Sequence, residues 1–454
     1  MNSEHSGVLM DLAARLRTGQ VTRRAFLERT LALGISSGAA LTLLNACGAV
    51  SGNSFGTQVT YWNLFGGGDG VRMVQMQDSF VHSHPALGLE AITLAWGEPY
   101  YTKLAMAAAG GRPPDVAISH MSRVSTYAQG ELLDPIDLDL LARHGIKADD
   151  FLPSIWEKAQ YNGKVYAVPL DTHPFVMYYN KQICQQAGLL DSDGKLKPLQ
   201  GPDAVIDAFK KAQQVTGAWG LAVDTQDVTP WRMFYTLYSQ LGGQIFSSDG
   251  KSLAIDNAKA TQALSFMRDL TVTSKVASPT ADYGAAVAFF GSNKAGFHWN
   301  GEWEVTTFQG QNMQFDMVPF PSIFGGNQVQ ADSHSFVIPH RLAVNPATRD
   351  AAYEFISSML KDSLVWSQGG HIPAYLPIAN SDAYKNLKPQ SNYAEVAANV
   401  VIDPPAWFSG SGAELENQAG AAFQPLLLGQ FTPQQSIDQF SAALQKLLNT
   451  PPPV

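Results

Sequence analysis

The sequence predicts an α/β protein with two domains, in which strands alternate with helices. Short β-rich runs at 58–62, 90–94 and 115–119 are separated by helical patterns and by Gly- or Pro-rich turns at 66–70 and 110–114. Such alternation through short turns is typical of mostly parallel sheets flanked by helices. The 454 residues are 45% hydrophobic and 15% charged, which indicates a well-buried globular protein that is too long for one compact core.

The remaining elements follow in order along the chain. After the first turn, Val71, Val74, Met76 and Phe80 form the apolar face of a helix, and an Ala-rich helix follows the second strand at 101–109. Two extended runs then come in quick succession, at 164–170 and 174–179, which is typical of a chain that passes from one sheet into another. Further helices are expected at 181–187, 202–216, 231–241, 258–273, 346–361 and 433–448, and further strands at 295–299, 315–319 and 335–339.

Residues 1–46 resemble an export signal. Five Arg precede an uncharged apolar run over 31–46, which is shorter than the ~20 residues of a membrane-spanning helix. The stretch Thr22-Arg23-Arg24-Ala25-Phe26-Leu27 resembles a twin-arginine signal, and Ala46-Cys47 resembles a lipoprotein cleavage box. The alternative is an amphipathic N-terminal helix of a cytosolic protein. The export interpretation predicts a chain outside the cytoplasmic membrane, anchored to it by a lipid on Cys47 and by a linker over 47–56.

The charge balance and the cysteine count argue against several classes of function. The net charge is −9 although residues 1–46 are basic, and an acidic surface disfavours nucleic acid and polybasic membrane contacts. With Cys47 lipidated, Cys184 has no partner for an intramolecular disulfide. His82-Ser83-His84, with Pro85 beside it, is interpreted as a solvated helix end rather than a metal site. The turn at 191–194 lacks the later ligands of a calcium loop, and no P-loop is present. We therefore expect no cofactor and no metal.

Eight short motifs follow one another over much of the chain. They are Tyr61-Trp62; Pro114-Asp115-Val116 with 129–134; 162–169; 178–181 with 187–189; 289–296; Asn300-Gly301-Glu302-Trp303; 351–356; and Gly370-His371-Ile372-Pro373. In this order they resemble the extracellular solute-binding proteins of ABC importers that bind sugars and oligosaccharides, the relatives of maltose-binding protein. The resemblance covers nearly the whole chain after the signal.

This resemblance implies two α/β lobes of the type II periplasmic-binding-protein fold, joined by a hinge of crossing segments near 170–174 and 317–321. A ligand would lie between the lobes, at the carboxyl ends of the strands, and the lobes would close over it. A membrane permease would recognise the closed form, and we expect the binding protein to be a monomer. The predicted division is lobe one, 57–171 and 320–365, and lobe two, 172–319 and 366–454.

The first candidate ligand-binding residues follow the first strand. Aromatic faces match the C–H patches of sugars, and Trp62 ends this strand, at the edge of the sheet where the α/β rule places ligands. Phe65 and Gly66 come directly after it in the glycine-rich turn. The alternative for Trp62 is a place in the core.

A second group lies after the 295–299 strand. In relatives this turn places an aromatic ring against the sugar, a role that the resemblance assigns to Trp303. Trp299 flanks the same turn, and Gly301 would allow the backbone to approach a ligand closely. Glu302 could accept a hydroxyl proton or face solvent.

The third group is polar. Asp171 and His173 lie on the predicted crossing, where a carboxylate beside an imidazole suits two-point binding of hydroxyls; the alternative is a turn-forming Asp and a surface His. His120 follows the third strand, and His334 precedes the strand that returns to lobe one. Two further aromatic candidates for the second half of the site are Trp231 and Trp407. Core or surface positions are expected for Trp96, Trp156, Trp219 and Trp366.

Three functions remain open from the sequence. The first is a substrate-binding lipoprotein of a carbohydrate importer, which needs recognition and closure but no catalysis. The second is a secreted hydrolase of glycans, for which Asp171 and Glu302 are the only obvious pair of carboxylates. The third is a binding protein for a non-sugar solute such as a glycerophosphodiester, which the scarcity of Arg and Lys near the predicted cleft disfavours. The sequence favours the first.

Overall fold

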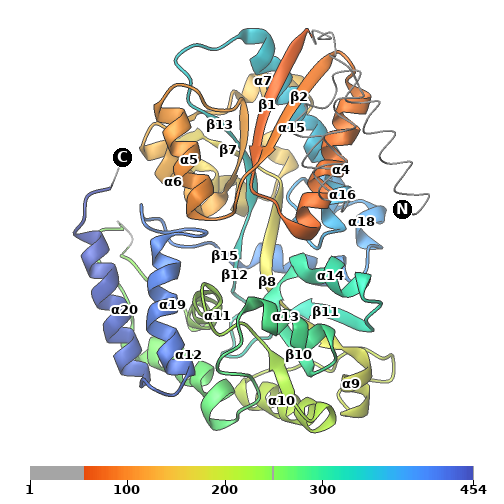
Figure 1. Ribbon diagram of the computed structural model, residues 1–454, viewed down its shortest axis with the longest axis vertical. Coiled ribbons are helices and arrows are strands. Elements are labelled where there is room, and N and C mark those ends of the chain that lie inside the picture. Colours follow the sequence, from red (N-terminus) through yellow and green to blue (C-terminus); the bar gives the residue numbers. More distant parts are fainter. Residues whose placement is uncertain (1–55, 248–249, 453–454) are drawn as a thin grey trace, which may run out of the picture.

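The computed structural model describes residues 56–247 and 250–452. The predicted export signal, Cys47 and nearly all of the predicted linker lie outside these residues. No helix in the two described ranges combines the length and apolar character that a membrane crossing requires. The chain forms two lobes stacked along the long axis of the molecule (Figure 1).

The first lobe contains a six-stranded sheet. Across the sheet the strands are β2 (Leu87–Thr93), β1 (Thr57–Asn63), β3 (Val116–His120), β13 (His334–Pro339) and β4 (Leu133–Asp134), with β7 (Ala167–Pro169) also paired to β13. β1 is parallel to both β2 and β3, as the alternation of strands and helices predicts. β13 is antiparallel to β3, because it enters the sheet from the other lobe.

The helices of the first lobe bury apolar stripes against this sheet. α4 (Gly67–Ser83) buries Met73, Met76 and Phe80, whereas Val71, which the sequence placed on the same face, is exposed. Asn345 caps α15 (Pro346–Lys361) by accepting from the backbone N–H of Ala347. The other helices here are α5 (Glu98–Ala109), α6 (Met121–Gln129), α7 (Leu138–Arg143), α8 (Pro153–Lys158), α15 (Pro346–Lys361), α16 (Ser363–Ser367), α17 (Leu376–Ala379) and α18 (Asp382–Lys385).

The second lobe contains a seven-stranded sheet. Its main path is β15 (Val400–Val401), β12 (Val329–Asp332), β8 (Asp171–Asn180), β10 (Ala295–Gly301) and β9 (Trp219–Ala222), and β11 (Phe315–Pro319) and β14 (Ile372–Pro373) also pair with β8. Every ladder on β8 is antiparallel, so the predicted parallel pairing occurs here only for β9–β10 and β12–β15.

Helices surround this second sheet and enclose its core. Asp256 and Asp282 cap two of them by accepting backbone N–H groups of the first turn. The helices are α9 (Lys181–Gln186), α10 (Pro202–Thr216), α11 (Thr229–Gln240), α12 (Asn257–Arg268), α13 (Tyr283–Gly291), α14 (Val305–Gly310), α19 (Glu414–Leu427) and α20 (Pro433–Leu448). A short hairpin, β5 (Gln160–Tyr161) and β6 (Lys164–Val165), and short irregular helices at 148–150, 269–273, 302–304 and 390–398 complete the described chain.

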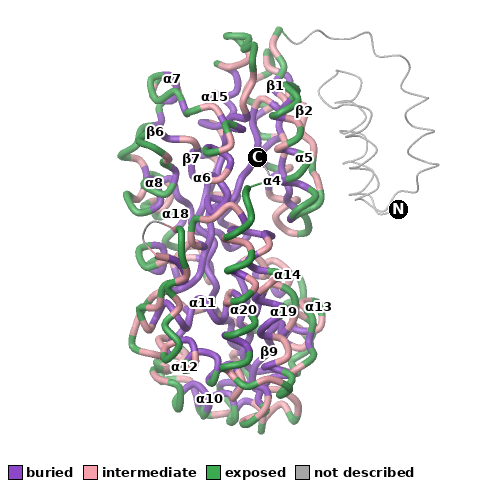
Figure 2. The backbone as a smooth tube through the Cα atoms, turned by 90° about the vertical axis from the view of Figure 1, so that its left-hand side faces the viewer, coloured by how far each residue is buried: buried purple, intermediate pink, exposed green. Residues whose placement is uncertain are grey.

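The strand β8 carries the chain from the first lobe to the second, near the predicted 170–174. All ten of its residues are buried, and buried segments run through the waist between the lobes (Figure 2). The return lies at 332–334 rather than at the predicted 317–321, because β11 and β12 both still pair with β8. Trp366 and Tyr375 belong to the first core, although the predicted boundary assigned them to lobe two.

Candidate functional site

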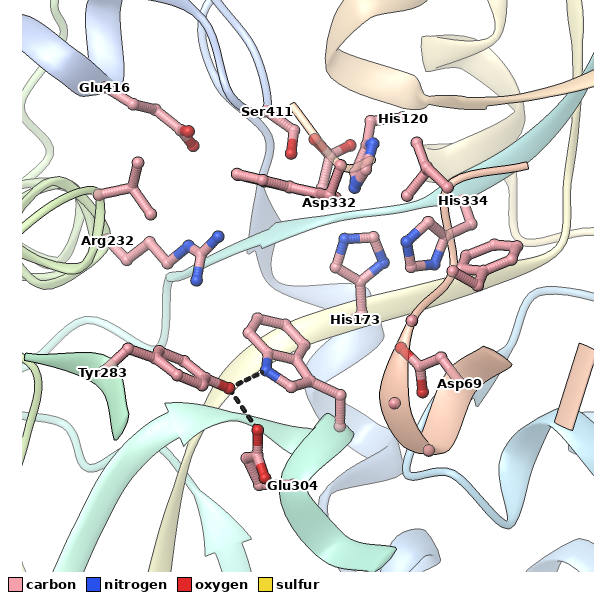
Figure 3. Close-up of a pocket in the computed structure, with 18 of the residues that line it drawn as sticks. Asp69, His120, His173, Arg232, Tyr283, Glu304, Asp332, His334, Ser411 and Glu416 are labelled. Carbon is pink, nitrogen blue, oxygen red and sulfur yellow. Dashed lines mark hydrogen bonds between the residues drawn. The ribbon is translucent and has the colours of Figure 1, made fainter. Parts of the chain in front are cut away.

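A cavity of about 510 Å³ lies between the two lobes. Figure 3 shows side chains entering it from strand ends of the first lobe and from helices of the second. This position, outside the carboxyl ends of strands and between lobes, is where α/β proteins bind small ligands. The lining residues are Leu64, Phe65, Gly66, Gly67, Gly68, Asp69, Trp96, His120, His173, Val228, Arg232, Tyr283, Trp303, Glu304, Thr307, Gln330, Asp332, His334, Ser411 and Glu416.

The glycine-rich turn between β1 and α4 forms one edge of the cavity. Gly67 has φ +52°, a conformation that glycine adopts at no steric cost. At Gly68 a Cβ would lie 2.4 Å from Oγ1 of Thr306, which belongs to α14 of the other lobe. The absence of side chains therefore allows this turn to approach the second lobe closely. Asp69 lies in the first turn of α4.

The carboxylate of Asp171 organises one wall of the cavity from behind. Asp171 is fully buried at the start of β8. Its Oδ1 accepts from Nδ1 of His173 at 3.0 Å and from the backbone N–H of His334 at 2.8 Å. Its Oδ2 accepts from Nδ1 of His334 at 2.7 Å and from Nε1 of Trp366 at 2.6 Å. Burial alone would raise the pKa of Asp171, but His334 and His173 hold it well below the usual range.

These bonds anchor the two imidazoles through Nδ1. Because an ionised Asp171 only accepts, His173 and His334 both donate to it through Nδ1, and Nε2 of each ring takes no part in these bonds. The third ring of this wall, His120, contacts the hydroxyl of Tyr101 through Nδ1 at 2.6 Å. Burial, followed by the neighbouring imidazoles, holds the pKa of His120 well below its ordinary value and lowers that of His173 to about 3. These three residues, His120, His173 and His334, form the histidine wall of the cavity (Figure 3).

A buried ion-pair chain lies behind the histidine wall. Nε2 of His371 lies 3.0 Å from Oδ1 of Asp69, and its Nδ1 lies 2.9 Å from Oε1 of Glu302 in an ion pair without hydrogen-bond alignment. Burial would lower the pKa of His371, but Asp69 and Glu302 hold it well above its ordinary value. The charged imidazole thus connects α4 of the first lobe to the turn that ends β10 of the second.

The second lobe contributes an aromatic wall, defined by Tyr283 and Trp303. The hydroxyl of Tyr283 donates to Oε1 of Glu304 at 2.5 Å and accepts from Nε1 of Trp303 at 2.7 Å (Figure 3). Asn300 donates to the same hydroxyl at 3.2 Å. The guanidinium carbon of Arg232 lies 5.2 Å from the centre of the Trp303 ring, within cation–π range. A flat apolar ring is thus surrounded by groups that can bind hydroxyls.

Two buried carboxyls complete the lining. Asp332 accepts from the backbone N–H groups of Ser122 at 3.1 Å and Ser333 at 2.8 Å, and it is also bonded to the Ser122 hydroxyl. Burial raises the pKa of Asp332 to about 7. Glu416 accepts from the N–H of Gly412 at 2.7 Å, and burial raises its pKa to about 8. Near neutral pH these groups can therefore donate as well as accept.

The structure brings six of the predicted site residues together in the cavity lining: Phe65, Gly66, His120, His173, Trp303 and His334. Three more lie directly behind it. Asp171 and Glu302 hold histidines rather than facing the cavity. Gly301 permits the Trp303 ring to lie across the backbone, since a Cβ there would be 1.9 Å from that ring.

Four predicted tryptophans lie outside the cavity lining. Trp299 is fully buried, with its ring 4.6 Å from Phe320 in the second core. Trp231 is fully buried too and donates to Oδ1 of Asp403.

The other two lie at the edges of the lobes. Trp407 packs against Phe408 at a ring distance of 5.3 Å. Trp62 lines an outer groove of the first lobe with Glu98 and Lys103, whose ammonium lies 5.3 Å from the ring centre. Strand alternation explains this position, because Tyr61 and Asn63 on either side of Trp62 are the buried residues.

Sequence reasoning missed the residues that only the fold brings together. Trp96 lines the cavity although a core or surface place was expected, and its position after β2 obeys the same strand-end rule that selected Trp62. Asp332 lines the cavity as well, although the sequence predicted a role only for His334 in the Asp332-Ser333-His334 motif. For the others no local pattern stood out: Asp69, Arg232, Tyr283, Glu304, Gln330, Ser411 and Glu416.

Two α/β lobes around a ligand-sized cavity define a two-lobed binding protein. Residues 89–363 match the family described as bacterial extracellular solute-binding protein, and the chain belongs to that family. It is similar to the crystallised GacH receptor of Streptomyces glaucescens, with a TM-score of 0.73, 21% identity, and coverage of 87% of this chain and 98% of that one. It is also similar to the maltotriose-bound MalE domain of Bdellovibrio bacteriovorus, with a TM-score of 0.68, 19% identity, and coverage of 87% and 100%. Together they confirm the predicted two-lobed fold.

Curated relatives agree at lower coverage. The maltotriose-binding protein of Pyrococcus abyssi is 23% identical over 299 residues, which are 62% of this chain and 59% of that protein. The chain therefore spans about three-fifths of that relative's length. A maltooligosaccharide ABC transporter solute-binding lipoprotein of Streptococcus pneumoniae is 23% identical over 325 residues, 66% of this chain and 72% of the relative.

Proposed function

We propose that the protein is the substrate-binding component of an ABC importer and that it captures a sugar or oligosaccharide between its lobes. The observation that carries this proposal is the aromatic wall. The Trp303 ring is held in place by Tyr283 at the edge of a 510 Å³ cavity whose polar lining groups include hydroxyls, imidazoles, an amide and carboxyls. A ring for the C–H face of a pyranose and a rim for its hydroxyls are the two elements that sugar recognition needs.

The named ligands of relatives support an oligosaccharide. Among the proteins that this chain resembles are binders of maltotriose and of maltooligosaccharides. The volume accommodates a short oligosaccharide, and Trp96 and Trp303 offer rings from opposite lobes. We infer that the two rings hold successive sugar units when the lobes are closed.

A glycan hydrolase is less well supported by the carboxylates. Asp171 and Glu302, the pair that the sequence suggested, do not line the cavity, so neither can flank a glycosidic bond there. Four carboxyls line the cavity, and each is bound within the protein. Asp69 pairs with His371, and Glu304 accepts from Tyr283. Asp332 accepts from the backbone N–H groups of Ser122 and Ser333, and Glu416 accepts from that of Gly412. A phosphodiester is disfavoured as well, because Arg232 is the single Arg or Lys among the described lining residues.

Delivery to a membrane permease and a lipid anchor on Cys47 belong to the same proposal. A lipid on Cys47 would keep the two lobes near the importer at the outer face of the membrane, with 47–56 as a linker. A relative described as a lipoprotein of an ABC transporter supports this arrangement. Mass spectrometry of the exported protein tests it, and a Cys47 without a lipid would contradict the anchor while leaving the ligand proposal intact.

Titration calorimetry with a panel of gluco- and maltooligosaccharides tests the ligand. We expect saturable binding of at least one member, and at least ~10-fold weaker binding by Trp303→Ala. Trp62→Ala is the matched control, because Trp62 lies in the outer groove, and its affinity should stay within about 2-fold of wild type. Release of reducing ends from a glycan, or equal losses in the two variants, would contradict the proposal.

A further inference from the structure

We propose that the histidine wall binds a divalent transition-metal ion through the Nε2 atoms of His120, His173 and His334, with open coordination positions facing the cavity. This departs from the expectation of no metal that the sequence alone supports. It also goes beyond the proposed sugar function, since neither the family nor the relatives' names mention a metal.

The first observation is that each ring is anchored through Nδ1 and has Nε2 left over. Nδ1 of His173 and of His334 bond to opposite oxygens of Asp171. Nδ1 of His120 contacts the hydroxyl of Tyr101. Within the described residues, none of the three Nε2 atoms has a hydrogen-bond partner in the protein, and all three side chains line the cavity. Metal-binding histidines are held in this way, with the second nitrogen on a carboxylate or another acceptor.

The second observation is the closeness of the rings. The ring centres of His173 and His334 are 4.1 Å apart, and that of His120 lies 4.7 Å from His334 and 5.4 Å from His173. Figure 3 shows the three rings gathered at one side of the cavity. The His173 and His334 planes differ by only 26°, so a shared ion requires the rings to tilt their Nε2 edges together. The site is therefore completed by ion binding rather than fully preformed.

The opposite side of the cluster is not available to an ion. Asp171, His173, His334 and His371 each offer one ligand atom within 4.8 Å of the others. However, Asp171 already accepts bonds from both histidines and from Trp366. Both nitrogens of His371 lie against carboxylates, on Asp69 and Glu302. Asp171 therefore acts from behind as a positioning residue, and the free nitrogens point to the cavity side.

The chemistry of the ligand set defines the class of ion. Three imidazoles suit Zn²⁺, Ni²⁺, Cu²⁺ or Co²⁺, whereas Mg²⁺ and Ca²⁺ prefer oxygen ligands. A histidine binds a metal ion through an unprotonated ring nitrogen, and Nε2 is the nitrogen that the anchors on Nδ1 leave open. Ligation through Nε2 requires His120 to carry its proton on Nδ1, so Tyr101 accepts from this ring in the metal-bound form.

Calorimetry on the chelator-treated full chain, produced without a polyhistidine tag, tests the site. Zn²⁺ or Ni²⁺ should bind with one equivalent, and Mg²⁺ and Ca²⁺ should not. Co²⁺ should give visible d–d absorption, a signal that reports histidine coordination directly. His334→Ala and His173→Ala should weaken Zn²⁺ binding at least ~100-fold. Tyr101→Phe removes the hydroxyl that contacts Nδ1 of His120 and accepts from its backbone N–H, and it should weaken binding about 10-fold.

A matched control addresses the other histidine–carboxylate cluster. His144 and His84 both contact Glu354 in the first lobe, so His144→Ala removes a histidine from a histidine–carboxylate cluster that does not line the cavity. This variant should bind Zn²⁺ as wild type does. No Zn²⁺, Ni²⁺ or Co²⁺ binding by wild type, or a loss in His144→Ala with no loss in Tyr101→Phe and His334→Ala, would overturn the proposal. Circular dichroism of each variant separates lost binding from lost folding. Tyr101→Phe keeps the aromatic ring, so it remains a usable test variant if His334→Ala unfolds.

The metal and the sugar proposals fail separately. Sugar titrations are run once with chelator and once with Zn²⁺. Absence of metal binding overturns the metal site alone, whereas the aromatic wall is tested by Trp303→Ala in chelator. If the ion takes part in ligand binding, Zn²⁺ should strengthen sugar affinity in wild type and leave it unchanged in His334→Ala.

Discussion

The two walls of the cavity are held in different ways. On the histidine wall every ring has a buried anchor, and the central one is an ionised carboxylate that is fully shielded from solvent. On the opposite side, Trp303 and Tyr283 are partly exposed, and Trp303 bonds to the Tyr283 hydroxyl, which also bonds Glu304 and Asn300. Among the described residues, no carboxylate oxygen lies within 4 Å of the Arg232 guanidinium, which instead lies over the Trp303 ring. One wall is thus built before a ligand arrives, and the other is able to adjust around it.

The largest expected effect comes from removing the anchor of the histidine wall. Asp171→Ala leaves the ring protons of His173 and His334 and the indole N–H of Trp366 without an acceptor in a buried site. A buried donor that loses its acceptor costs about 1–3 kcal/mol, so three such donors should cost at least about 3 kcal/mol together. We therefore expect the free energy of unfolding, measured by urea denaturation, to fall by that amount.

A surface carboxylate provides the control for this variant. Asp193 is exposed in the turn after β8 and α9, and Asp193→Asn should change the free energy of unfolding by less than about 0.5 kcal/mol. If Asp171→Ala were as mild as Asp193→Asn, the histidine wall would not depend on its buried carboxylate. The contrast between a prebuilt and an adjustable wall would then lose its basis.

The sequence predicted the histidine wall better than the aromatic one, for a physical reason. Asp171-Thr172-His173 and Asp332-Ser333-His334 are short polar motifs in segments that cross between lobes, so local pattern and position agree. Residues such as Arg232 and Tyr283 lie on helices whose facing side depends on packing between distant segments. No period in the sequence reports that packing.

The tryptophans show the same limit in another form. Every residue of β10 is buried, so its sequence lacks the alternation of apolar and polar residues that would indicate which side chains face the cleft and which face α10. Trp299 packs against Phe209 of α10 and Trp303, four residues later, turns into the cavity. The two-lobed fold itself was predictable, because it rests on the order of many elements rather than on the orientation of one.

An intermediate effect should appear in the pH dependence of the free energy of unfolding, through Glu416 of the second lobe. Glu416 is buried on α19, and its pKa of about 8 lies above the ~4.3 of an unfolded Glu. Between these values the folded chain keeps a proton that the unfolded chain releases, so stability falls as pH rises, by up to about 1.4 kcal/mol per pH unit. Glu416→Gln keeps the acceptor for the Gly412 N–H and removes this titration.

The measurement is urea unfolding of wild type and Glu416→Gln at several pH values from 5 to 8. The variant should show the flatter profile and be the more stable protein at pH 8. Glu414→Gln, on the first turn of the same helix, should retain the wild-type slope. Parallel profiles for Glu416→Gln and wild type would mean that Glu416 is ionised in the fold, so that both walls would hold their carboxyls charged.

The smallest effect tests how loosely the aromatic wall is held. Tyr283→Phe removes the hydroxyl that accepts from Trp303 and donates to Glu304, while the ring stays in place. Since a typical hydrogen bond contributes about 1 kcal/mol, we expect a sugar affinity about 5-fold weaker in calorimetry and a similarly small loss of stability. Tyr161→Phe, on the hairpin of the first lobe, should change neither quantity. An affinity loss as large as that of Trp303→Ala would show that the orientation of the Trp303 ring, and not only its surface, depends on this hydroxyl, and the aromatic wall would then be as preorganised as the histidine wall.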